Sequence, residues 1–286
     1  MTPFELVEPR TLREAAGLLA AGEPSVRAMA GGTALMLMMK MGVLQPTRLV
    51  SLRAVEKRYS EVSGGDGELR IGAMTTLAAL ERSPEVRNRA PVIARALRTL
   101  ANVRVRNVAT AGGHLAHADP HLDLPPVLIA LGASVTTVRP EGGRTIPLEK
   151  LYAGYLETTL ASDELIAEVT VPAQGERRAA YLKCTTRSAD DWPALGIAVA
   201  LDADRALVRD ARIVLSAATD TPMRLGAAED ALRGARVDEG LLRRAADAAA
   251  SEAAVIADGH GSAAYKRELV RVYVARAVRA ALASEG

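Results

Sequence analysis

The segment TAGGHLAHADPHLDLPP, Thr110–Pro126, shares a pattern with a second segment, MAGGTALM, Met29–Met36. Each places a Gly-Gly pair after a short apolar or β-prone stretch and before small or apolar residues. Glycines let backbone amides converge on an anion, and they lack the Cβ atoms that would obstruct a phosphate. Two such turns that face one another predict a pyrophosphate site, with the hydroxyls of Thr33 and Thr110 as further donors. For either turn alone, a plain tight turn remains the simpler interpretation.

The first segment also suggests a metal site, because it holds three of the four histidines and two aspartates: His114, His117, His121, Asp119 and Asp123. On a helix, histidines three and four residues apart would share one face. However, prolines interrupt the segment at positions 120, 125 and 126, and Gly-Gly precedes it, so we expect no continuous helix here. HExxH is also missing. We therefore expect no metal site, and we interpret His117 and His121 as exposed loop residues.

The composition limits the classes of function. The net charge is only +2, the charges are interspersed, and aromatic residues make up 3% of the chain, which argues against a nucleic-acid partner. Its one cysteine, Cys184, excludes an internal disulfide and a cysteine-ligated iron–sulfur cluster within this chain. No apolar run is long enough to span a membrane, and the N-terminal residues do not resemble a signal peptide. These features predict a soluble, cytoplasmic protein.

The hydrophobic patterning predicts an α+β protein with two domains. Thr11 and Glu14 form a capping box that should open a helix ending at Gly22. A hairpin is expected around SGGDG, residues 63–67, and a strand over DELIAEVTVP, residues 163–172. The polar, glycine-containing stretch 174–178 marks the domain boundary. Beyond it, three alternating strands precede three amphipathic helices.

An ordered set of segments resembles a known family, the FAD-binding medium subunits of molybdenum hydroxylases such as carbon monoxide dehydrogenase and xanthine dehydrogenase. The resemblance covers nearly the whole chain and rests on FELVEPRTLREAAGLLA, AGGTALMLMMK, RLVSLRAV, ELRIGAMTTLAAL, VRVRNVATAGGHLAHADPHLDLPP and DELIAEVTVP. It implies a two-part PCMH-type FAD-binding domain over residues 1–175, with subdomains of about 1–55 and 56–175. A smaller α+β domain with an antiparallel sheet and helices would follow over 176–286.

The resemblance also implies a function. The chain would be the FAD-binding oxidoreductase subunit of a heteromeric molybdenum hydroxylase. It would pass electrons from the iron–sulfur clusters of a small partner subunit through FAD to an external acceptor such as NAD or oxygen. Molybdopterin would lie in a large partner subunit. No residue of this chain is expected to be catalytic in its own right.

The family's site residues carry over to matching positions here. The first turn, which would wrap the pyrophosphate through its amides, comprises Ala30, Gly31, Gly32, Thr33 and Ala34. The second turn would face it with Thr110, Gly112, Gly113 and His114. The resemblance further implies that Asp123 bonds the nucleoside end, and that Lys183 lies near the flavin or its approach, where a cation stabilises the reduced ring.

His114 departs from the family pattern, which has Asn after the second Gly-Gly. If that side chain bonds the cofactor, affinity becomes pH-dependent near the imidazole pKa. Two alternatives stay open from the sequence. One is a stand-alone PCMH-type flavoprotein oxidoreductase that acts on its own small substrate. The other is a flavin-free assembly module that kept the fold.

Overall fold

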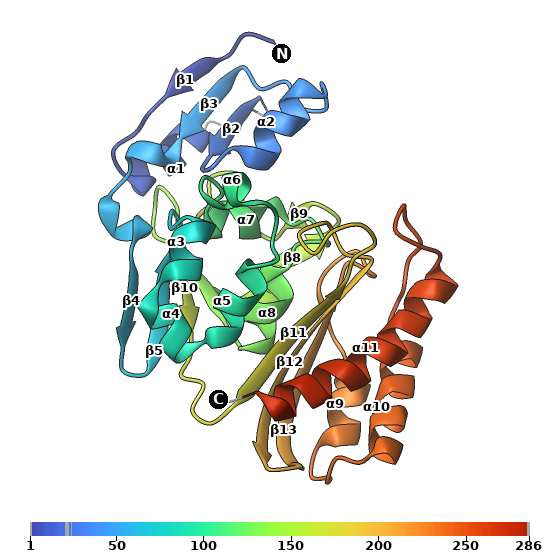
Figure 1. Ribbon diagram of the computed structural model, residues 1–286. Coiled ribbons are helices and arrows are strands. Elements are labelled where there is room, and N and C mark those ends of the chain that lie inside the picture. The colour runs from blue at the N-terminus through green and yellow to red at the C-terminus, as the bar shows by residue number, and fades with distance from the viewer. Residues whose placement is uncertain (1, 21–22, 24, 285–286) are drawn as a thin grey trace.

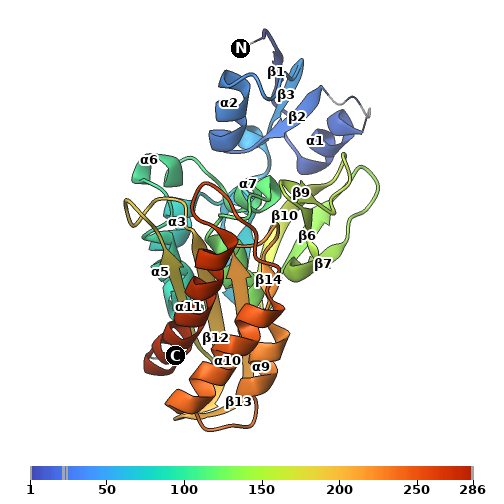
Figure 2. The same ribbon diagram turned by 90° about the vertical axis from the view of Figure 1, so that its right-hand side faces the viewer.

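A computed structural model describes residues 2–20, 23 and 25–284, and it has an α+β architecture built on three principal sheets (Figures 1 and 2). The sheets follow one another along the chain, and the helices pack beside them. Among the described residues, no helix is both long and apolar enough to cross a lipid bilayer. The α+β class expected from the sequence is confirmed.

The first sheet is parallel, with strand order β1-β3-β2, and two helices accompany it. Its elements are β1 (Glu5–Val7), α1 (Leu12–Leu19), β2 (Val26–Met29), α2 (Thr33–Lys40) and β3 (Arg48–Ser51). The capping interaction is confirmed: Thr11 Oγ1 accepts from the Glu14 amide at 3.0 Å. The Glu14 carboxylate in turn accepts from the Arg10 amide at 2.8 Å. The expected stop at Gly22 lies outside the described residues.

The second sheet is antiparallel, with strand order β4-β5-β10-β6-β7. Its strands are β4 (Val62–Gly65), β5 (Glu68–Gly72), β6 (Ser134–Val138), β7 (Thr145–Pro147) and β10 (Leu165–Val171). The predicted hairpin joins β4 to β5 through Asp66 and Gly67, whose φ angles of 50° and 81° suit a tight turn. The predicted strand β10 pairs with β5 on one side and β6 on the other, at the centre of the sheet.

Six helices lie between β5 and β6: α3 (Leu77–Arg82), α4 (Pro84–Arg89), α5 (Pro91–Leu97), α6 (Val103–Arg106), α7 (Ala111–His117) and α8 (Leu124–Ala130). Short elements complete this part of the chain: η1 (Leu52–Ala54), η2 (Lys57–Ser60), η3 (Leu148–Lys150) and the hairpin β8 (Tyr152–Gly154) and β9 (Glu157–Thr158). α8 is fully buried, with Leu, Val and Ile on every side. It therefore forms a central element of the core.

The third sheet is antiparallel, with order β11-β12-β13-β14, and three helices cover one face (Figure 1). Its elements are β11 (Arg178–Cys184), β12 (Leu195–Asp204), β13 (Leu207–Ser216), β14 (Met223–Arg224), α9 (Gly226–Leu232), α10 (Glu239–Glu252) and α11 (Ala263–Ala283). The order of strands followed by helices confirms the sequence pattern. The other face packs on α8, because Ala198, Ala200 and Val214 belong to the same buried cluster as Leu128.

Candidate functional site

The first glycine turn joins β2 to α2 and leaves the start of that helix open. Gly32 is the residue before the helix and has φ 70°, a left-handed conformation that suits glycine. Among the described residues, no side chain caps α2. The first amides of a helix point outward and carry its positive dipole end, so this turn offers an anion site.

The second glycine turn opens a short helix. Gly112 and Gly113 lie in the first turn of α7, which runs over Ala111–His117. Thr110 caps this helix, since its hydroxyl accepts from the Gly113 amide at 3.2 Å. The helix ends at Ala118, in a left-handed conformation, before Pro120 and His121. The expectation that no continuous helix runs through the three histidines is therefore confirmed.

The amides of the second turn are already used within the chain. Ala111 donates to the Thr75 carbonyl at 2.9 Å, and Gly112 donates to the Ala73 carbonyl at 2.7 Å. With Gly113 bonded to Thr110, the first three amides of α7 all have acceptors. The two turns therefore differ: in the described part of the chain, the first leaves its helix without a side-chain cap, while the amides of the second are already bonded.

The two turns lie against each other. A Cβ added to Gly31 would lie 2.2 Å from the Val108 carbonyl oxygen and 2.8 Å from the Ala109 Cα, just before the second turn. A Cβ on Gly113 would lie 3.2 Å from the Ala30 Cβ. Glycine is thus required at position 31 for the close approach of two backbones. The structure brings the two predicted turns into one place.

His114, the residue after the second Gly-Gly pair, has a buried polar atom. Its Nε2 is buried and has no hydrogen-bond partner among the described residues, although the residue as a whole is only half-buried. Burial, with a smaller contribution from nearby His117, lowers the pKa of His114 to about 3. The imidazole is therefore neutral at physiological pH, and the expected pH-dependence near neutrality is not supported. An unpaired buried nitrogen is typical of a site completed by a ligand.

Asp123 and Lys183 lie in a buried ion pair with each other. Lys183 Nζ donates to Asp123 Oδ2 at 2.9 Å, and the Tyr181 hydroxyl donates to Oδ1 at 2.5 Å. Burial raises the pKa of Asp123, while Lys183 and Tyr181 oppose that shift. Lys183 also donates to the carbonyls of Thr99 at 2.8 Å and Asp191 at 3.1 Å, so all three of its N–H groups have acceptors.

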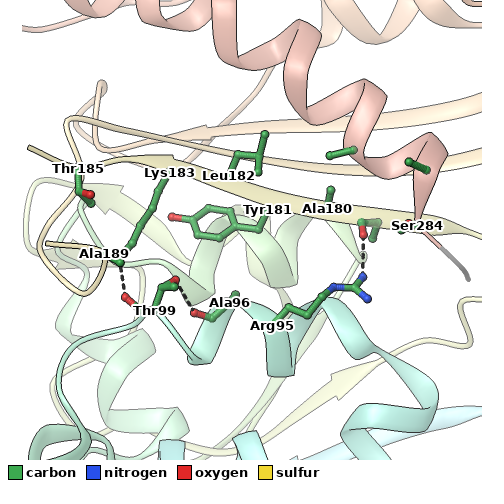
Figure 3. A pocket seen from close by; sticks show the side chains of 13 residues that line it. Arg95, Ala96, Thr99, Ala180, Tyr181, Leu182, Lys183, Thr185, Ala189 and Ser284 are labelled. Atoms are coloured by element: carbon green, nitrogen blue, oxygen red, sulfur yellow. Dashed lines mark hydrogen bonds between the residues drawn. The ribbon is translucent and has the colours of Figure 1, made fainter.

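Figure 3 shows where the Lys183 side chain points. It lies along the wall of a cavity of about 520 Å³ formed by α5, β11 and the C-terminal end of α11. Arg95 of α5 and Thr99, just after this helix, face Tyr181 and Lys183 across this space (Figure 3). None of the residues of the two glycine turns lines this cavity. The site residues thus fall into two groups, one at the turns and one at the Asp123–Lys183 pair.

Arg106 precedes the second turn but bonds to other segments, since its guanidinium donates to Glu81 at 3.1 Å and to the Leu100 carbonyl at 3.0 Å. The interpretation of His121 as an exposed loop residue is wrong, because only 11% of its side chain is exposed and both ring nitrogens face carboxylates.

Tyr181 is a residue that the sequence reasoning missed. It lies two residues before Lys183 on β11, so both side chains project from the same face of the strand toward Asp123. That i, i+2 spacing was a usable signal. Within the described residues, no cluster of His, Cys, Asp and Glu is arranged to hold a metal ion.

The arrangement fits a dinucleotide. An uncapped helix start provides amides for phosphate oxygens, and two glycine backbones allow close approach. Among the described residues, the buried Nε2 of His114 has no hydrogen-bond partner. Neither turn has the spacing of a P-loop or of the GxGxxG fingerprint. FAD is the dinucleotide that the family resemblance implies.

Comparison with known proteins agrees. A family described as "FAD binding domain in molybdopterin dehydrogenase" matches residues 2–174, and one described as "CO dehydrogenase flavoprotein C-terminal domain" matches residues 180–281. The nicotine 6-hydroxylase medium subunit of Paenarthrobacter nicotinovorans is 34% identical over 272 residues, 94% of each chain. The carbon monoxide dehydrogenase medium chain of Hydrogenophaga pseudoflava is 32% identical over 280 residues, 98% of this chain and 97% of that one.

Solved structures give the same result. A chain of the Hydrogenophaga pseudoflava carbon monoxide dehydrogenase superposes with a TM-score of 0.95 at 34% identity, covering 99% of both chains. A chain of quinoline 2-oxidoreductase from Pseudomonas putida superposes with a TM-score of 0.92 at 28% identity, covering 99% of this chain and 98% of that one. The chain therefore belongs to the family of FAD-binding medium subunits of the molybdenum hydroxylases.

Proposed function

We propose that this chain passes electrons from the iron–sulfur clusters of a small partner subunit through FAD to an external acceptor. The observation that carries the proposal is the contact between the two glycine turns beside the uncapped start of α2. When bound, FAD supplies the oxidation–reduction chemistry, and the chain supplies position and electrostatics. The single cysteine, Cys184, cannot hold an iron–sulfur cluster, so the clusters belong to another chain.

In this proposal the first turn binds the pyrophosphate. The first amides of α2, with Thr33 and Ala34 at its start, donate to phosphate oxygens and add the positive end of the helix dipole. Gly31 and Gly32 keep the backbone clear of Cβ atoms, and Ala30 contributes only a methyl group. Charge-assisted hydrogen bonds of this kind are each worth about 1.5–3 kcal/mol.

The second turn closes the site from the other side. Gly112 and Gly113 offer a smooth backbone face, and the hydroxyl of Thr110 holds the turn rigid through the Gly113 amide. His114 is neutral, so its Nε2 either accepts from a cofactor hydroxyl or donates to a phosphate oxygen, according to tautomer. Unlike the family's Asn, it provides one functional atom there rather than two.

Asp123 and Lys183 act together in the proposal. Each oxygen of Asp123 keeps a lone pair beyond the one used by Tyr181 or Lys183, and this can accept from a nucleoside hydroxyl or amino group. Lys183 uses all its donors within the chain, so it acts through the Asp191 carbonyl that it holds. It fixes the segment between β11 and β12, and its charge is balanced by Asp123.

We propose the same domain organisation as the sequence predicts: cofactor-binding subdomains of about 1–55 and 56–175, and a C-terminal domain over 176–286. Three buried clusters support it, one around Leu12, Val26 and Val50, one around Leu128, and one around Ile197 and Val274. The second cluster includes residues of β12 and β13, so the C-terminal domain docks firmly. We place the protein in the cytoplasm, since a free cysteine suits a reducing compartment.

The partners in this proposal are an iron–sulfur small subunit and a molybdopterin-containing large subunit. Support comes from the relatives, which are named as medium chains or subunits of nicotine 6-hydroxylase and carbon monoxide dehydrogenase. The external acceptor would be NAD, oxygen or another oxidant. Substrate would meet the large subunit and not this chain.

The native complex tests this function. We would purify it through a tag on this chain and measure flavin, molybdenum, iron and acid-labile sulfide. We expect FAD on this chain, with molybdenum and iron–sulfur clusters in two co-purifying chains, and reduction of the flavin on adding substrate. Recovery of the chain alone, with FAD reduced directly by a small substrate, would favour a stand-alone flavoprotein. Recovery without flavin would favour an assembly module.

A further inference from the structure

His121 joins two carboxylates that come from segments far apart in the chain. Its Nδ1 lies 2.9 Å from Asp119 Oδ1, in the segment that leaves α7, and its Nε2 lies 3.0 Å from Asp258 Oδ2, in the turn before α11. The two aspartates are 139 positions apart in the chain. The side chain is 11% exposed, so the contacts are largely shielded from water.

The contacts continue beyond Asp258 to a buried lysine. Lys266 is fully buried, and its Nζ donates to Asp258 Oδ2 at 2.6 Å and to the Ala217 carbonyl at 2.8 Å. The row Asp119–His121–Asp258–Lys266 therefore alternates in charge when His121 is protonated. When His121 is neutral, two carboxylates face one ammonium, which leaves an uncompensated negative charge.

An indole ring covers the same imidazole. Trp192 stacks on His121, with 5.5 Å between ring centroids and 9° between planes, and half of its surface is exposed. Trp192 belongs to the segment between β11 and β12, the segment that Lys183 holds through the Asp191 carbonyl. His121 thus contacts this segment at Trp192, next to the residue that Lys183 holds.

The protonation state decides how many of these contacts survive. A protonated imidazole donates from both nitrogens, whereas a neutral one has a single N–H and can donate to only one carboxylate. Burial acts to lower the pKa of His121, but the hydrogen bonds and charges of Asp119 and Asp258 outweigh it and raise the pKa above 6.5. The other charged or titratable groups nearby are His260, whose ring lies 5.3 Å away, and Lys266, His117 and Asp191.

We propose that His121 is a positioning residue that, in its protonated form, clamps the exit of α7 to the turn before α11 and holds Trp192 in place. Loss of its proton breaks one of the two carboxylate contacts and frees the segment over residues 185–194. The clamp depends on His121 and its neighbours alone, so it goes beyond the proposed function and stands whether or not FAD binds.

Trp192 is the only tryptophan in the sequence, so the tryptophan fluorescence of the chain comes from this residue alone and reports on its contact with His121. An imidazolium in contact with an indole quenches its fluorescence, and a neutral imidazole quenches far less. In the full chain we expect tryptophan emission to rise with pH in one step, with a midpoint above 6.5. Amide hydrogen exchange over residues 185–194 should increase at the same midpoint, beyond the intrinsic pH-dependence of exchange.

Three variants separate the clamp from other causes. His121→Asn should remove the fluorescence step and the exchange step. Asp119→Asn keeps the imidazole but removes one charge, so the midpoint should fall by about one pH unit. His260→Asn is the matched control: it removes the neighbouring imidazole and should leave the midpoint where it is.

Two results would overturn the clamp. One is a folded wild-type chain whose emission has no step above pH 6.5. The other is a step that keeps its midpoint in His121→Asn. If His121→Asn does not fold, Asp119→Asn decides the question, because an unmoved midpoint there excludes His121 as the titrating group.

Discussion

Gly31 lies so close to Val108 that the backbones of the two glycine turns touch: a Cβ at position 31 would lie 2.2 Å from the Val108 carbonyl oxygen. This contact joins segments that are 77 positions apart in the chain. It places the uncapped start of α2 beside α7 and defines the cofactor site that we propose. Its consequences can be tested by substitutions that change little else.

Gly31→Ala should abolish retention of FAD. The added methyl group would overlap a backbone carbonyl, which cannot move as a flexible side chain does, and overpacking of this kind costs about 1–3 kcal/mol. We would measure bound flavin per chain and the free energy of unfolding. Gly17→Ala is the matched control: it lies in α1, no atom of the described residues is within 4 Å of the added Cβ, and it should keep flavin. Full flavin occupancy in Gly31→Ala would count against the site.

Lys183→Met should destabilise the fold strongly. The side chains of Lys183 and Asp123 are 7% and 5% exposed, and removing one member of a buried pair costs about 3–5 kcal/mol. Denaturant unfolding would measure the loss. In Lys183→Met/Asp123→Asn, part of the stability should return, because no buried charge remains unpaired.

An ion pair on the protein surface provides the control for the buried Lys183–Asp123 pair. Arg70 and Glu68 form a 3.6 Å ion pair with side chains 56% and 40% exposed, and such pairs contribute little. Arg70→Met should leave the free energy of unfolding nearly unchanged. A loss as large as that of Lys183→Met would mean that the assay reports loss of charge in general.

Glu164 should make the free energy of unfolding depend on pH in the acid range. Burial acts to raise its pKa, but hydrogen bonds from Arg144, Thr137 and the Ala161 amide outweigh it and lower the pKa to about 2 from 4.5. Because the folded pKa is depressed, the stabilisation is present above pH 4.5 and is lost as pH falls toward 2. Urea unfolding across that window should show the loss.

Glu164→Gln removes the titrating group, so its unfolding free energy should fall less steeply over the same pH window. Glu157→Gln changes an exposed carboxylate on β9 and should keep the wild-type slope. Equal slopes in wild type and Glu164→Gln would assign the acid sensitivity to other groups.

His114 should leave FAD affinity independent of pH near neutrality. With a pKa of about 3, the imidazole stays neutral between about pH 5 and 8, so no proton is taken up or released there. Fluorescence titration of the flavin at several pH values would measure this. His114→Asn restores the family's residue and should bind FAD at least as tightly, while a midpoint near 6.5 in the wild-type affinity would contradict a buried neutral imidazole.

Local patterns predicted much of the fold. The capping box at Thr11, the hairpin turn at Asp66 and Gly67, and the central strand β10 could all be read from short segments, because their determinants are neighbours in sequence. α7 was missed because glycines and prolines were counted against a helix. The prolines follow its end, and a threonine cap with tertiary packing outweighs the low helix propensity of glycine.

The site was predicted in part. The meeting of the two glycine turns was anticipated from their similarity, and the contact of Ala30 with Gly113 confirms it. The hydrogen bonds made by the second turn's amides were not anticipated, because their acceptors, the carbonyls of Ala73 and Thr75, belong to a distant segment. His121 was misread for the same reason, since its partner Asp258 is 137 residues away. Local sequence carries little information on such pairings.

The most direct test of the central claim compares FAD with FMN as ligands of the flavin-free full chain. Both carry the same ring, but FMN has one phosphate and no adenosine, so it cannot place a pyrophosphate between the turns. We predict one FAD per chain, and FMN binding weaker by at least about tenfold, which corresponds to 1.4 kcal/mol. Equal affinity for the two flavins, or no FAD bound at saturating concentration, would contradict the account.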